Sequence, residues 1–127
     1  MNKIPIKPLS INKCYKGRRF KTSDYLKYCG FVPIFLNKNS RIPKGKLEIS
    51  FKFYLSTSLA DWDNPIKPIQ DIICKYYGIN DNRIYRGTGE KIIVKKGQER
   101  TEYVIKKYRE KKEISNPLRR RGYRTKF

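Results

Sequence analysis

The chain has 127 residues, with 31 lysines and arginines against 11 aspartates and glutamates, so its formal net charge is +20. It contains no histidine, which excludes a Ser-His-Asp or Cys-His nucleophilic site and any histidine-ligated zinc site. A chain of this length favours a single domain. The charge predicts a polyanion as the partner, and nucleic acid is the polyanion that we expect.

The cysteine count and the hydropathy exclude two further classes of protein. Cys14, Cys29 and Cys74 are odd in number and far apart, which indicates reduced, packed thiols rather than a disulfide framework or a zinc ribbon. No apolar run approaches the roughly 18 residues that span a bilayer, and the N-terminal residues lack an apolar signal core. We therefore expect a cytoplasmic protein with no membrane partner.

The first half of the chain predicts a helix, a strand and a second helix, in that order. Residues 13–27 are a basic segment with interleaved aromatic residues. Within it, Ser23 or Asp24 can cap a short helix that runs through Tyr28. Residues 46–55 alternate apolar and polar side chains, as a half-buried strand does. Apolar residues over 66–77 recur at helical spacing, which predicts a helix that Asp63 or Asn64 caps and that ends at Gly78.

The second half predicts more strands and a basic arm. A short strand begins at residues 84–85, residues 87–89 read as a turn, and strands at 91–96 and 100–106 form a hairpin around residues 97–98. Residues 108–127 are rich in lysine and arginine and form a basic C-terminal extension. The predicted fold class is α+β: residues 1–107 form a single small domain in which a mixed β-sheet packs with about two helices.

The acidic residues are the informative exceptions in so basic a chain. Four of the 11 carboxylates fall within 21 residues, and Asp61 and Asp63 project to the same side if the backbone between them is extended. Such a pair suits Mg²⁺, which prefers oxygen ligands and keeps several waters. Lys67 and Asp71 share one helical face, and a chain reversal at residue 78 returns Asp81 toward the first pair. A helix cap, a surface ion pair and a turn residue are the purely structural alternatives.

These residues resemble a known motif. Their spacing is similar to that of the RusA-type Holliday junction resolvases, which are phage-associated endonucleases acting on four-way DNA junctions, and the likeness spans about residues 4–107. Asn80 departs from the pattern, since the family often has an acid there. The matching run reads Asp61-Trp62-Asp63-Asn64-Pro65-Ile66-Lys67, then Asp71, and then Asp81-Asn82-Arg83-Ile84.

The resemblance implies a chemistry and an assembly. By position, Asp61, Asp63 and Asp81 match the metal-binding carboxylates and Lys67 the catalytic lysine, with Asp71 and Asn64 in supporting places. The metal that we expect is Mg²⁺, for which Mn²⁺ can substitute. The implied function is an Mg²⁺-dependent endodeoxyribonuclease that resolves four-way junctions by paired symmetric nicks. The resemblance further implies a homodimer that supplies the two sites, in a bacterial or phage-infected cell.

The basic residues are expected to contact the phosphates of several DNA arms. An alternative function stays open, namely a nucleic-acid-binding protein without catalysis, either ribosome-associated or a degenerate resolvase. The expected DNA-binding residues in the body of the domain and in the extension are Arg18, Arg19, Lys21, Arg119, Arg120 and Arg121.

Overall fold

Strand β4 (Leu47–Leu55) is the centre of the fold, and every second side chain along it is buried. In the computed structural model, which describes residues 2–17 and 20–110, β4 lies between β5 (Ile84–Ile93) and β6 (Arg100–Lys107). The short strand β1 (Asn2–Ile4) pairs with the outer side of β6, so the sheet order is β1-β6-β4-β5. Because β5 runs parallel to β4 and β6 antiparallel to it, the predicted α+β class with a mixed sheet is confirmed.

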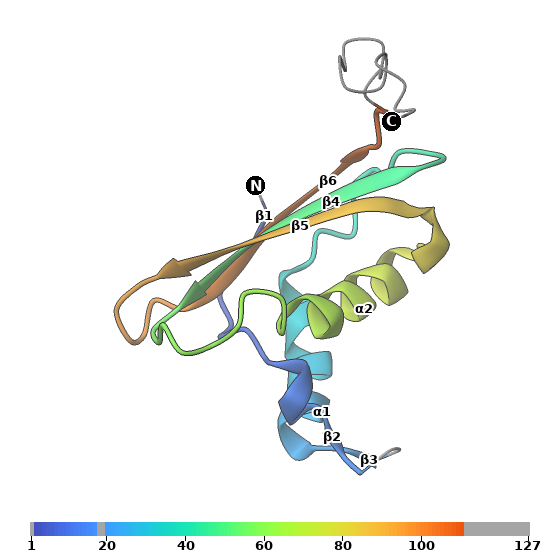
Figure 1. The fold of residues 1–127 in the computed structure, drawn as a ribbon. Helices are drawn as coiled ribbons and strands as arrows, with labels where there is room; N and C mark the ends of the chain where they lie inside the picture. The colour runs from blue at the N-terminus through green and yellow to red at the C-terminus, as the bar shows by residue number, and fades with distance from the viewer. Residues whose placement is uncertain (1, 18–19, 111–127) are drawn as a thin grey trace, which may run out of the picture.

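Two helices lie on one face of this sheet (Figure 1). Helix α1 (Ser23–Phe31) continues into the 3-10 turn η2 (Val32–Phe35), and α2 (Ile66–Tyr77) is followed by the 3-10 turn η3 (Asp81–Arg83). A third 3-10 turn, η1 (Ile11–Lys13), precedes a two-stranded ribbon of β2 (Tyr15–Lys16) and β3 (Phe20–Lys21). The ribbon lies beside α1 at the end of the molecule away from the sheet (Figure 1).

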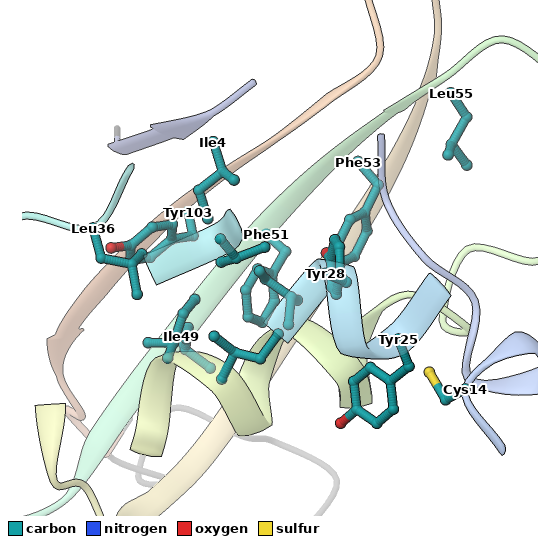
Figure 2. Packing of buried hydrophobic residues seen from close by; sticks show 14 residues of the cluster. Ile4, Cys14, Tyr25, Tyr28, Leu36, Ile49, Phe51, Phe53, Leu55 and Tyr103 are labelled. Atoms are coloured by element: carbon teal, nitrogen blue, oxygen red, sulfur yellow. The ribbon is translucent and has the colours of Figure 1, made fainter. Parts of the chain in front are cut away.

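The core fills the space between the sheet and the helices. Figure 2 shows side chains of β4 and α1 packed together there, with Phe51 and Phe53 stacked at 5.4 Å between ring centroids. Ile69 and Ile73 of α2 are fully buried against the same cluster. Burying one such side chain contributes about 1.5–3 kcal/mol. The packing therefore fixes α2 against β4, and with it the segments at both ends of the helix.

The predicted hairpin around residues 97–98 is wrong. Strands β5 and β6 follow one another in the chain but do not pair, because β4 lies between them and bonds to both. The parallel pairing of β4 with β5 through α2 makes a βαβ unit, which buries the apolar stripe of α2 against the sheet. Local turn chemistry predicted the hairpin, whereas the burial of this helix decides the pairing.

The predicted turn at residues 87–89 is also wrong, because β5 runs without interruption through both glycines. Gly89 lies beneath the ring of Trp62: a Cβ atom at this position would stand 3.1 Å from Trp62 Cε3 and 3.2 Å from Ile66 Cδ1. A glycine inside a strand often marks such a close approach rather than a turn. Gly89 thus lets the segment before α2 pack directly on the sheet.

The helix ends were predicted only in part. Gly78 adopts φ 66° and ends α2 as expected, and Pro68 falls in the first turn. The predicted side-chain cap by Asp63 or Asn64 is wrong, because no side chain caps α2 and the backbone carbonyl of Asp63 accepts from Ile66 N at 3.1 Å. In α1 the cap is Thr22, whose hydroxyl accepts from the backbone N–H at residue 25. The side chains of Asp63 and Asn64 are therefore not used to cap α2.

Part of the predicted basic extension, residues 111–127, lies outside the described residues. No helix within residues 2–17 or 20–110 combines the length and the apolarity needed to cross a membrane.

Candidate functional site

Three of the predicted site residues meet at one atom. Lys67 Nζ lies 2.9 Å from Asp71 Oδ1 and 4.0 Å from Asp81 Oδ2. The hydrogen bond to Asp71 raises the pKa of Lys67, so the ammonium group stays charged at neutral pH. The predicted sharing of one helical face by Lys67 and Asp71 is confirmed. The side chains of Lys67 and Asp81 are more than half exposed, so this cluster is open to a ligand from solvent.

The position of Asp81 is set by the turn that contains it. Asn80 caps η3 through its side chain, which accepts from the backbone N–H at residue 82. Arg83 then donates to the backbone carbonyls of Gly45 and Pro43, which ties the turn to the segment before β4. On its inner side Asp81 faces Cys74, and burial together with this carboxylate raises the pKa of Cys74 to about 12. The Cys74 thiol is therefore neutral, and within the described residues the basic group beside Asp81 is Lys67, at 4.0 Å.

Asp61 and Asp63 lie on the segment between β4 and α2, on either side of Trp62, and both are exposed. Lys91 of β5 holds this segment by donating to the carbonyls of Ser58 at 2.9 Å and Ala60 at 2.7 Å. The ring of Trp62 rests on Gly89, as described above.

A further contact joins the two ends of residues 61–64, which we call the acidic segment. Asn64 Nδ2 lies 3.4 Å from Asp61 Oδ2, and the Asn64 carbonyl accepts from Ile11 N. Together with the Lys91 and Trp62 contacts, these interactions anchor both ends of the acidic segment while its carboxylates face solvent.

The structure does not gather the three carboxylates that the resemblance assigns to a metal. Among residues 2–17 and 20–110, no three or more Asp, Glu, Cys or His side chains are grouped so that they could hold a metal ion. The contacts bring Asp81 to Lys67 and Asp71, and bring Asp61 to Asn64. Oxygen donors of this kind still suit Mg²⁺, which is commonly bound through one or two carboxylates plus substrate phosphate.

Of the predicted DNA-binding residues, Lys21 alone lies within the described part of the chain. It is exposed on β3, with its Nζ 5.3 Å from the centroid of the Tyr25 ring. The other five predictions fall outside the described residues; they are Arg18, Arg19, Arg119, Arg120 and Arg121.

The sheet face that the helices leave open carries paired charges. The strand register places Lys3, Glu102, Lys52 and Glu90 in one row across the four strands, so the signs alternate. Opposite charges on facing strands stabilise each other, and this row has no net charge. We therefore place the candidate site on the helical side of the domain, where Lys67, Lys75 and Lys21 lie on α2 and β3.

Sequence reasoning missed the residues that support the site. Lys91 looked like one of many surface lysines, and its two carbonyl partners come from a loop more than 30 positions away. Gly89 carried a usable signal, since a glycine inside a strand pattern indicates close approach of another group. Cys74 had no signal beyond its place on the buried stripe of α2.

Comparison of the sequence with protein-family models gives no match, and a search among curated proteins finds no similar sequence. The resemblance to the RusA-type resolvases therefore stays a prediction, and the function has to be argued from the site itself.

Proposed function

We propose that this protein is a magnesium-dependent endonuclease that cuts four-way DNA junctions. The observation that carries the proposal is the cluster of Lys67, Asp71 and Asp81, all three of which belong to the predicted motif. In this cluster both carboxylates contact the ammonium group of Lys67. A lysine held between two carboxylates stays charged and oriented at neutral pH. Such a group stabilises the negative charge that develops on a phosphate during hydrolysis.

The acidic segment supplies the second part of the proposed site. Asp61 and Asp63 are exposed on a segment that Lys91 and Trp62 hold in place, so their carboxylates face solvent on a fixed backbone. With Asp81 they are the proposed ligands of Mg²⁺, or of Mn²⁺ in its place. When bound, the metal would polarise the scissile phosphate and acidify a bound water. The chain has no histidine to act as the general base, which fits this chemistry.

The protein's own residues would then divide the work. Lys67 neutralises charge at the phosphate, and Asp71 holds the lysine in position at 2.9 Å. The large positive charge of the chain attracts the DNA backbone, with an affinity that falls steeply as salt concentration rises. Paired symmetric nicks need two such sites, so the proposal includes a homodimer whose twofold axis matches that of the junction.

The test is cleavage of a synthetic four-way junction. We expect the native chain to nick two opposed strands with Mg²⁺ and to leave the junction intact in EDTA. Asp63→Asn removes one proposed ligand and is expected to lower the cleavage rate at least 100-fold, a loss typical of removing one stabilising group. Asp24→Asn, the same substitution on an exposed position of α1, serves as the matched control and is expected to cut normally.

Two outcomes would contradict the proposal in different ways. Equal cleavage by the native chain and Asp63→Asn would remove that residue from the site. Junction binding that persists without nicking in Mg²⁺ or Mn²⁺ would favour the alternative, a nucleic-acid-binding protein without catalysis.

A further inference from the structure

A cavity of about 530 Å³ opens between α1, α2 and the β2–β3 ribbon. Three tyrosines and two lysines give it its chemical character, and they come from all three of these elements. We call it the tyrosine cleft and define it by Tyr15, Lys21, Tyr25, Lys75 and Tyr76. Its volume lies within the range of ordinary small-molecule sites, roughly 300–1,000 Å³.

Two aromatic rings of the cleft are accessible to a ligand. Tyr15 and Tyr76 keep 41% and 37% of their surface exposed, so their rings are accessible from the cleft. Tyr25 is buried behind them and meets Tyr15 edge-on at 5.5 Å between centroids. Burial raises the pKa of Tyr25, so its hydroxyl stays protonated and able to donate. Tyrosine rings of this kind stack on nucleic-acid bases, whatever the base identity.

The lysines of the cleft are available to an anion. Lys21 Nζ lies 5.3 Å from the centroid of the Tyr25 ring, and Lys75 is exposed on α2. Within the described ranges, no carboxylate forms an ion pair with either of them. The one acid of the lining is Asp71, whose charge is already offset by Lys67 at 2.9 Å. The wall is therefore basic where it meets solvent.

Asp71 also connects the cleft to the candidate site. Its side chain lines the cleft and at the same time holds Lys67, the proposed catalytic lysine. A ligand in the cleft thus lies next to the ammonium group that would contact the scissile phosphate. Stacking rings beside basic groups are the usual elements of a single-strand binding site.

We propose that the tyrosine cleft binds one unpaired nucleotide of the DNA substrate, with the base against Tyr15 and Tyr76 and its phosphate at Lys21 and Lys75. A base inside the double-helical stack cannot offer its faces to side chains, whereas an extruded or single-stranded base can. The cleft would favour DNA whose strands are unpaired near the cut. This inference rests on the proposed function, because it describes how the same site chooses its DNA.

The test measures binding in EDTA, where no cleavage takes place. The probe is a ten-residue oligothymidylate with one central 2-aminopurine, whose fluorescence reports stacking, compared with a blunt duplex of the same length. We expect the native chain to change the 2-aminopurine fluorescence and to bind the oligonucleotide. Tyr76→Leu and Tyr15→Leu are each expected to weaken this binding about 5- to 150-fold, the range typical of losing one base–aromatic stack.

Matched controls use the same substitutions outside the cleft. Tyr85→Leu changes an exposed tyrosine of β5 and is expected to bind like the native chain. Lys75→Gln removes one proposed phosphate contact, so the plot of log affinity against log salt concentration is expected to become less steep by about one. Lys95 lies outside the cleft lining, and Lys95→Gln is expected to leave this slope unchanged. Thermal unfolding of each variant checks that the fold is intact. The two substituted tyrosines lie on different elements, so a local folding defect would not weaken binding in both variants.

The inference is overturned if both tyrosine variants bind the oligonucleotide as the native chain does, or if Tyr85→Leu weakens binding equally. If the native chain nicks the junction but the tyrosine variants bind the oligonucleotide normally, the proposed role of the cleft is refuted and the proposed nuclease activity is not. Binding that depends on Tyr76 without any nicking would refute the nuclease and leave the cleft.

Discussion

Replacing Gly89 by valine is expected to push Trp62 off the sheet. A Cβ atom at this position would stand 3.1 Å from Trp62 Cε3 and 3.2 Å from Trp62 Cζ3 and Ile66 Cδ1. Because carbon atoms in relaxed contact lie about 3.5–4.0 Å apart, a single added carbon already requires the ring to retreat by roughly 0.5 Å. Valine adds two further carbons, and overpacking of this kind costs about 1–3 kcal/mol.

The assay uses the fact that Trp62 is the one tryptophan of the chain. Its fluorescence reports this contact without interference, so Gly89→Val is expected to shift the emission maximum to longer wavelength and to lower the midpoint of urea unfolding. Because Asp61 and Asp63 flank Trp62, we also expect junction cleavage to fall in this variant.

The matched control is Gly87→Val on the same face of the same strand. No atom lies within 4 Å of a Cβ there, and valine favours strands more than glycine does, so the stability is expected to stay equal or to rise. If Gly87→Val and Gly89→Val gave the same emission spectrum and the same unfolding midpoint, the contact between Trp62 and the sheet would be refuted.

Three more changes test other contacts. Lys67→Met is expected to lower junction cleavage about 100-fold while the unfolding free energy changes by less than about 1 kcal/mol, because the ion pair is exposed; a large loss of stability would contradict this. Burial opposes the charge of Glu102, but the Arg100 guanidinium and the Tyr54 hydroxyl outweigh it and lower its pKa. Glu102→Gln is therefore expected to destabilise the fold at pH 7, and this loss is expected to shrink as the pH falls below the ordinary glutamate pKa and through the lowered pKa of the folded protein; a loss that does not change with pH would contradict this. Burial raises the pKa of Cys14 to about 11, so the unfolding free energy should fall between about pH 9 and 11, where the unfolded thiol alone ionises, and should fall less steeply in Cys14→Ala; equal slopes in the two proteins would contradict this.

Patterns with a single period predicted the main elements of this fold. The alternation at residues 46–55 gave β4, and the helical spacing over 66–77 gave α2 with its end at Gly78. Each pattern arises because one face of the element is buried in the core, so it can be read from the residues of that element alone. The pairing of strands is a different matter, because it depends on which arrangement buries α2. The hairpin expected around residues 97–98 failed for this reason.

The candidate site was predicted where its residues belong to α2 and the turn that follows it. Lys67 and Asp71 are four residues apart on a helix, so their contact follows from helix geometry. The reversal at Gly78 was expected to return Asp81 toward Asp61 and Asp63, whereas the contact that it makes is with Lys67, at 4.0 Å. Two other contacts depend on the parallel pairing of β4 with β5: the hydrogen bonds from Lys91 to the carbonyls of Ser58 and Ala60, and the packing of Trp62 on Gly89. Nothing in the sequence around Lys91 indicated its hydrogen bonds.

The most direct test of the central claim is the mapping of strand breaks in a synthetic four-way junction incubated with the native chain and Mg²⁺. The proposed site predicts two nicks placed symmetrically across the junction, absent in EDTA and formed at least 100-fold more slowly by Asp63→Asn. A junction that stays intact with Mg²⁺ and with Mn²⁺, although the protein binds it, would contradict the claim.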